Sequence, residues 1–186
     1  MSFSFKLNQN DLNRIKKKLE ATVNAAQKEG SALYRYRFNI LDEYRKSIVS
    51  VMGVVDGDSG GSATSSRVLA KSFSVNWDSL SNMTLNVKRK LGYKLTIWEA
   101  SGETKRSVSV KGNFAGIDSK DNLDAFYKAL ETEFGGAHSE GEIPDYSKRA
   151  LFTIANQLVL DNLEQIKIRL ASGFIKTAKE NGWGSN

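Results

Sequence analysis

The first fifty residues carry apolar side chains at helical spacing. Apolar positions recur every three or four residues over 12–26, which predicts a helix with its N-cap at Asn10 or Asp11. Gly30 ends this helix, and the same spacing predicts a second helix over residues 31–52. The N-terminal part of the chain is therefore expected to be helical.

Two further helices are predicted toward the C-terminus. The segment NLDAFYKALETEF, residues 122–134, has a cap near Asn122, and the glycines at 135 and 136 end it. Residues 147–183 form a long amphipathic pattern that predicts one helix with an interruption at Gly173.

The middle of the chain has a different pattern. Residues 78–92 predict a short helix that begins at an Asp or Ser cap and stops at a glycine. Three short segments rich in β-branched and aromatic residues, 93–99, 105–112 and 113–118, predict strands. We therefore expect an α+β fold in which a small antiparallel β-sheet is packed by long N-terminal and C-terminal helices.

Three ranges divide this single domain. We expect an N-terminal helical region over 1–53, a flexible Gly/Ser loop over 54–67, and an α+β core with the C-terminal helix over 68–186. The loop residues of most interest are Asp56, Gly57, Asp58, Ser59, Gly60 and Gly61.

Composition excludes several kinds of chemistry. The 186 residues include no cysteine, which rules out disulfides, thiolate metal sites and a cysteine nucleophile. No apolar run approaches the roughly 20 residues that span a bilayer, and the start of the chain lacks a signal-peptide pattern. We therefore expect a soluble protein that is made inside the cell.

Charge is unevenly distributed along the chain. Residues 1–50 hold ten basic and five acidic side chains, and residues 67–111 hold nine and three. Residues 112–146 reverse the sign, with two basic and eight acidic side chains. This polarity fits contact with nucleic acid, and it fits head-to-tail docking of identical subunits equally well.

The string GDSGG resembles the sequence around the nucleophile of chymotrypsin-like proteases. A serine nucleophile needs a base and a group that orients the base. The only histidine, His138, follows Ser59 in the chain, whereas those proteases place it before the serine, within a first β-barrel. We therefore interpret GDSGG as a loop, and we expect no enzymatic activity, no metal and no cofactor.

Three landmarks carry a resemblance to a known family. The segment NWDSLSNMTLNVKRKLGYKLTIWEASGETKRSVSV has a W-x-x-L-S start, a small-residue turn at Ser101–Gly102 and a serine that opens a strand. AFYKALETEFGG follows, and then EIPDYSKRALFTIANQL. In this order they resemble the virion-morphogenesis, tail-completion and neck proteins of tailed bacteriophages. The matching positions include Trp77, Leu80, Ser81, Thr84, Lys88, Trp98, Ser107, Tyr127, Ala129, Glu133, Phe134, Gly135, Pro144 and Arg149.

The resemblance implies a structural role in virion assembly. The protein would be made in the host cytoplasm and would form a six- or twelve-fold homo-oligomeric ring at the neck–tail junction, between the portal complex and tail proteins. The DNA would pass through the lumen, where a non-specific contact is possible, and no membrane would be involved. Candidate interface residues are Lys88, Arg89, Lys90, Lys94, Glu131, Glu133, Phe134 and Arg149. The alternative is a nucleic-acid-binding module that uses the basic clusters NRIKKK and NVKRK.

Overall fold

The computed structural model describes residues 8–99, 101–134 and 149–183. It groups the chain into two compact units. Unit 1 comprises Met1–Phe38 and Glu164–Asn186, and unit 2 comprises Asn39–Leu163. The ranges expected from the sequence, 1–53, 54–67 and 68–186, do not coincide with these units, because unit 1 joins segments from both ends of the chain.

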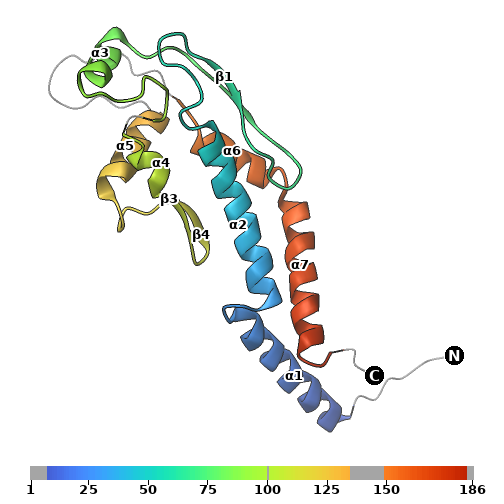
Figure 1. The fold of residues 1–186 in the computed structure, drawn as a ribbon. Helices are drawn as coiled ribbons and strands as arrows, with labels where there is room; N and C mark the ends of the chain where they lie inside the picture. The colour runs from blue at the N-terminus through green and yellow to red at the C-terminus, as the bar shows by residue number, and fades with distance from the viewer. Residues whose placement is uncertain (1–7, 100, 135–148, 184–186) are drawn as a thin grey trace. The chain divides into compact units, whose positions relative to one another are not determined.

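Unit 1 is helical. It holds α1 (Gln9–Gln27), the first part of α2 (Ala32–Val51) and most of α7 (Leu163–Glu180) (Figure 1). The Asn8 side chain accepts a hydrogen bond from Asn10 N at 3.0 Å, so the cap of α1 lies two residues before the predicted Asn10. The predicted extents of the first two helices are otherwise confirmed.

The C-terminal segment forms two helices rather than one. α6 (Phe152–Leu160) and α7 are separated at residues 161–162, where the Asn162 side chain donates to Leu158 O at 2.6 Å and competes with the backbone. The predicted interruption at Gly173 is wrong. Gly173 lies inside α7, where a Cβ would come within 3.2 Å of Leu33 Cα, so its lack of a side chain permits close helix packing.

Unit 2 combines short strands with helices. β1 (Gly61–Thr64) pairs antiparallel with β2 (Ser74–Trp77), and β3 (Val108–Lys111) pairs antiparallel with β4 (Phe114–Ile117). The register places Gly61 opposite Trp77 and Val108 opposite Ile117. The helices are α3 (Asn82–Lys90), α4 (Glu103–Ser107), α5 (Leu123–Phe134), α6 and the second part of α2.

The core of unit 2 lies among these elements. Ile48 of α2 and Met52 directly after α2 are fully buried, as is Leu151 just before α6. Trp77 and Trp98 are also buried and act as large apolar anchors of this core. The structure confirms the α+β class, with long terminal helices and small antiparallel sheets.

Two predictions for the middle of the chain are wrong. Residues 93–99 do not form a strand: Thr96 makes only an isolated bridge to Asp56, and the backbone of Trp98 is left-handed, with φ 61°. β1 lies within the predicted loop, because its partner β2 begins ten residues further along and no local pattern announces it.

Candidate functional site

Two tryptophans hold the segment that leads into α6. Trp77 Nε1 donates to Ala150 O at 3.3 Å, and Trp98 Nε1 donates to Arg149 O at 3.0 Å. The Trp98 ring also meets the Phe152 ring edge to face, with 5.7 Å between centroids. Landmarks far apart in the sequence therefore meet at residues 149–152.

The Glu133 side chain, which belongs to α5, caps the N-terminus of α6. Its carboxylate accepts hydrogen bonds from Leu151 N (2.7 Å), Phe152 N (3.0 Å) and Thr153 N (2.7 Å). The side chain is buried, with 3% of its surface exposed. Three donors and the positive end of the helix dipole offset the cost of burying this charge.

Arg149 is buried beside this cap. Its guanidinium Nη2 donates to Ser79 O at 3.0 Å, and its backbone N donates to Thr132 O at 3.1 Å. Sequence reasoning placed Glu133 and Arg149 on a subunit interface. In the structure both side chains join segments within their own chain.

Several of the predicted residues lie wholly or in part outside the described part of the chain. Glu131 and Phe134 belong to α5, but their side chains lie outside the described residues, as do Gly135, His138 and Pro144.

The basic cluster consists of Lys88, Arg89, Lys90 and Lys94. Most of these side chains form hydrogen bonds or ion pairs within unit 2. Lys88 Nζ donates to Thr96 O at 2.5 Å and to Glu99 O at 2.8 Å. Burial, and secondarily the charge of Arg149, lower the pKa of Lys88 to about 8, against an opposing effect of Glu99.

The other three cations of this cluster are at the surface. Arg89 pairs with Asp58 at 2.9 Å and Lys94 pairs with Glu99 at 2.6 Å. Among the described residues, Lys90 has no such partner. The structure therefore does not gather the four predicted cations into one free basic patch.

The GDSGG string forms a tight turn. Asp56 Oδ1 accepts from Asp58 N at 2.8 Å, from Ser59 N at 3.1 Å and from Ser59 Oγ at 3.3 Å. Hydrogen bonds from Ser59 and Asp58 lower the pKa of Asp56. Gly57 is buried, and its N–H donates to Leu95 O at 2.8 Å. The motif therefore fixes a backbone turn rather than presenting a nucleophile beside a base.

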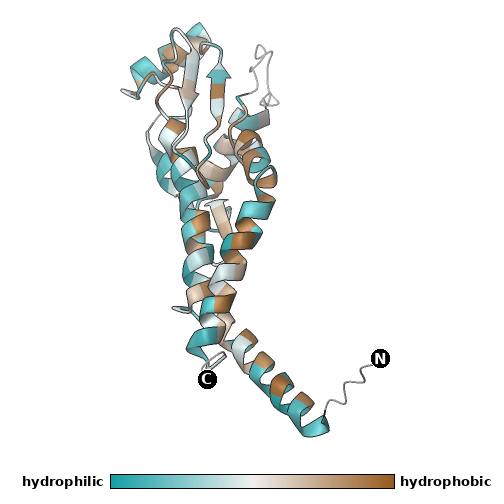
Figure 2. Cartoon of the chain, turned by 90° about the vertical axis from the view of Figure 1, so that its right-hand side faces the viewer, coloured by the Kyte–Doolittle hydropathy of each residue, from teal (hydrophilic) through white to brown (hydrophobic). Residues whose placement is uncertain are grey.

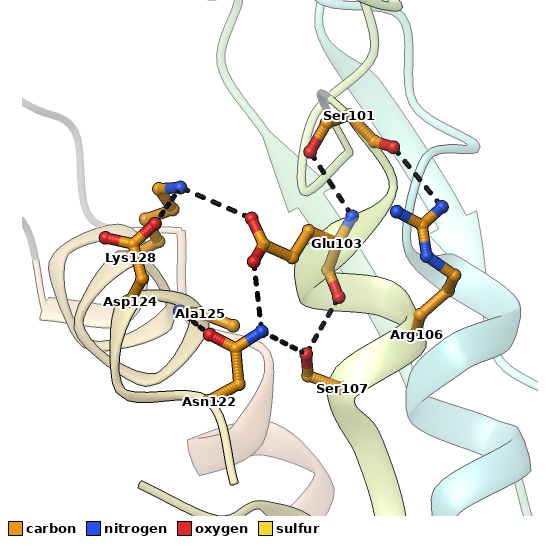
Figure 3. Close-up of polar contacts among 8 residues, drawn as sticks. All are labelled: Ser101, Glu103, Arg106, Ser107, Asn122, Asp124, Ala125 and Lys128. Carbon is orange, nitrogen blue, oxygen red and sulfur yellow. Dashed lines mark hydrogen bonds and ion pairs between the residues drawn. The ribbon is translucent and has the colours of Figure 1, made fainter.

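A polar network joins α4 to α5 (Figure 3). Asn122 Nδ2 donates to Glu103 Oε1 at 3.0 Å and to Ser107 Oγ at 3.2 Å, while its Oδ1 accepts from Ala125 N at 2.9 Å. Lys128 pairs with Asp124 at 2.5 Å and with Glu103 at 3.5 Å. The predicted cap at Asn122 is confirmed, whereas its link to Glu103 could not be found from the local sequence.

Unit 2 contains a cavity of about 530 Å³. Its lining is mostly apolar, and its polar groups include Tyr44, whose hydroxyl donates to Asn156 Oδ1 at 2.5 Å. Burial, and then the charge of Glu133, raise the pKa of Tyr44. The lining residues are Ile40, Leu41, Tyr44, Asn113, Phe114, Ala115, Gly116, Ile117, Phe126, Ala129, Leu130, Glu133, Phe152, Thr153, Asn156 and Val159.

Two helices expose apolar side chains in rows. Leu12, Ile15 and Leu19 of α1 are 40%, 48% and 47% exposed, and the hydrophobic positions along α1 are visible in Figure 2. On α5, Leu123 and Tyr127 are exposed, and Leu130 is exposed at the cavity lining. Sequence periodicity reveals both rows, but periodicity alone assigns them to a core.

Within residues 8–99, 101–134 and 149–183, no helix has the length and apolar character to cross a bilayer. The same ranges hold no group of three or more potential metal-ligating His, Cys, Asp or Glu side chains.

Comparison of the chain with protein-family models, with curated proteins and with solved structures finds no match in any of the three.

Proposed function

We propose that this protein is a structural component of a bacteriophage virion, a neck or tail-completion protein. The observation that carries the proposal is the convergence at the start of α6. Trp77 and Trp98 from the first landmark and Glu133 from the second all hydrogen-bond to residues 149–153 of the third. The three landmarks of the resemblance therefore form one hydrogen-bonded cluster, and this supports the proposal.

The surface also favours assembly. Rows of apolar side chains on α1 and α5 are exposed, and surfaces of this kind mark sites of protein–protein contact. We propose that copies of the chain form a six- or twelve-fold ring at the neck–tail junction. Its neighbours would be the portal complex and the tail proteins, reached after synthesis in the host cytoplasm.

The test is removal of the protein from the virus that encodes it. We expect electron microscopy to show filled heads and free tails that are not joined, and we expect a plasmid copy of the wild-type gene to restore joining. Particles that form with stably attached tails in the absence of the protein would contradict the proposal.

A second function, nucleic-acid binding, is favoured by the charge of unit 1. This unit holds twelve basic and five acidic residues, a net charge of +7, and Arg14, Lys16 and Lys17 are exposed on α1. The cluster near α3 supports DNA binding less, because most of its cations already have partners.

Filter binding distinguishes this function. If it holds, wild-type protein retains duplex DNA at low salt, and the Lys16→Gln, Lys17→Gln double variant lowers the slope of log affinity against log salt by about two. Lys90→Gln with Lys120→Gln removes the same charge from unit 2 and should leave the slope unchanged. Absence of DNA retention by wild-type protein at low salt would exclude the function.

A further inference from the structure

The first three turns of α1 are exposed to solvent in the part of the chain that the structure describes. Every described residue from 9 to 21 is exposed, and burial along the helix begins at Thr22, whose Oγ1 accepts from Trp183 Nε1 at 2.7 Å. Isolated helices of about this length are marginal in water. An exposed row formed by Leu12, Ile15 and Leu19 therefore calls for a partner surface.

The positive charge of α1 and of unit 1 restricts which surfaces can bind the exposed row of α1. α1 carries four basic residues, Arg14, Lys16, Lys17 and Lys18, against two acidic ones, and unit 1 as a whole has a net charge of +7. Pairing of unit 1 with unit 1 of a second copy would bring like charges together. The partner is therefore expected to be apolar at its centre and neutral or acidic around it.

Unit 2 has a surface with these properties. Its fifteen basic and sixteen acidic residues give a net charge of −1. Residues 112–134, which include much of the cavity lining, hold five acidic and two basic side chains. Leu130 belongs both to the cavity and to the exposed row of α5, so the apolar surface is continuous there.

The two rows also match in length. Leu12 and Leu19 are seven residues apart, as are Leu123 and Leu130, and seven residues of helix span about 10.5 Å. The cavity volume of about 530 Å³ lies in the range of pockets that bury apolar groups. An amphipathic helix that places its apolar side into such a groove is a common mode of recognition.

We propose that α1 of one copy docks its apolar row into the α5 groove of a second copy, the groove being the exposed row of α5 and the adjoining cavity. This inference rests on the proposed ring and specifies its contact. The contact uses different surfaces on the two copies, so each copy keeps one free α1 and one free groove. Repetition then closes a ring or extends a chain.

The test uses two variants that each disable one side. Ile15→Lys alters the α1 row, and Tyr127→Lys alters the groove at a side chain that is 56% exposed, so neither disturbs the core. We expect sedimentation velocity to show concentration-dependent oligomers for wild-type protein and monomers for each variant. Met83→Lys, on a side chain that is 65% exposed on α3, is the matched control and should assemble like wild type.

Mixing the two variants is the decisive measurement. An equimolar mixture contains one intact α1 and one intact groove, so it should form heterodimers and nothing larger. A symmetric α1–α1 contact would leave Tyr127→Lys self-associating like wild type, because its α1 is intact, and would overturn the inference. Wild-type protein that is monomeric at every concentration would also overturn it.

Three further outcomes separate the explanations. If both variants assemble like wild type, the docking contact is wrong although the ring proposal stands. If α1 binds vesicles of anionic lipid, Ile15→Lys abolishes this binding, and wild-type protein does not self-associate, the row is a membrane-surface helix and the inference fails. Joined tails in particles that lack the protein would refute the proposed function even where heterodimers form.

Discussion

At the scale of single residues, three positions show how side chains hold unit 2 together. The buried Glu133 carboxylate receives three backbone N–H groups at the start of α6. Gly57 is buried where the backbone of residue 95 passes closely. Lys88 places a partly buried ammonium against two carbonyl oxygens. Each position is sensitive to a specific chemical change.

Replacing Glu133 should destabilise the protein. Glu133→Ala leaves three N–H groups without their acceptor, and we expect a loss of about 1–3 kcal/mol in the free energy of unfolding. Glu133→Gln keeps one acceptor oxygen and should lose less. Urea unfolding measures both, with Glu164→Ala on an exposed carboxylate of α7 as the control. Equal stability of Glu133→Ala and wild type would contradict the capping role.

The GDSGG turn should depend on Gly57 and not on Ser59. A Cβ at Gly57 would lie 2.1 Å from Leu95 O, so Gly57→Ala must displace backbone and should cost about 1–3 kcal/mol. Ser59→Ala removes only an exposed hydroxyl and should stay within about 0.5 kcal/mol of wild type. Thermal unfolding compares the two variants, and the reverse order of stability would show that the serine is the essential residue.

The lowered pKa of Lys88 predicts that the free energy of unfolding rises at alkaline pH. Its pKa in the folded protein is about 8, below the ordinary 10.5, so the unfolded chain holds a proton that the folded chain releases. The free energy of unfolding attributable to this lysine should therefore increase from pH 8 to about 9.5. Above pH 10 the raised pKa of Tyr44 acts in the opposite direction.

The measurement is chemical unfolding across that pH window. Lys88→Met should lose the rise relative to wild type, whereas Lys90→Met, on an exposed neighbour in α3, should keep it. Parallel pH profiles for wild type and Lys88→Met would show that Lys88 titrates as it does in the unfolded chain.

At the scale of elements, α4 and α5 are joined through one amide. Asn122 caps α5 and also donates to Glu103 and Ser107 (Figure 3). The hydrogen bond from Asn122, and then the charge of Lys128, lower the pKa of Glu103. Because α5 supplies part of the cavity lining and an exposed apolar row, this joint holds the proposed groove in place.

Asn122→Asp separates the two roles of that amide. The new carboxylate can still cap α5, but it replaces a donor to Glu103 with a like charge. We expect lower thermal stability than wild type at pH 7, with the difference narrowing near pH 4 as one carboxylate takes up a proton. Asn113→Asp, in the turn between β3 and β4, is the control. A deficit that does not change with pH would exclude repulsion as its cause.

At the scale of the whole molecule, charge is divided between the units. Unit 1 has a net charge of +7 and unit 2 a net charge of −1. Opposite local charge around an apolar contact accelerates association and selects the partner, and it is screened by salt. The α1–groove contact should therefore be electrostatically assisted.

Salt should weaken self-association. Between 50 and 500 mM NaCl we expect the association constant of wild-type protein to fall roughly tenfold, because screening removes the attraction between the basic helix and the acidic surroundings of the groove. Sedimentation velocity at both concentrations measures this. Tighter association at high salt would indicate that like charges meet at the interface.

The amino-acid sequence by itself determined the α+β class, the extents of α1, α2 and α5, and the presence of strands β3 and β4. It did so because helical periodicity, capping and turn formation depend on residues close in the chain. The Asn122 cap and the burial of Trp77 and Trp98 follow from the same local and compositional preferences.

Only the tertiary structure decided which groups are partners. Glu133 reaches residues 151–153, and Trp98 reaches Arg149, across separations that no local pattern encodes. β1 exists because β2 pairs with it. The apolar row of α1 looks like a core face in the sequence, yet it is exposed, because burial depends on what the rest of the chain brings against a helix.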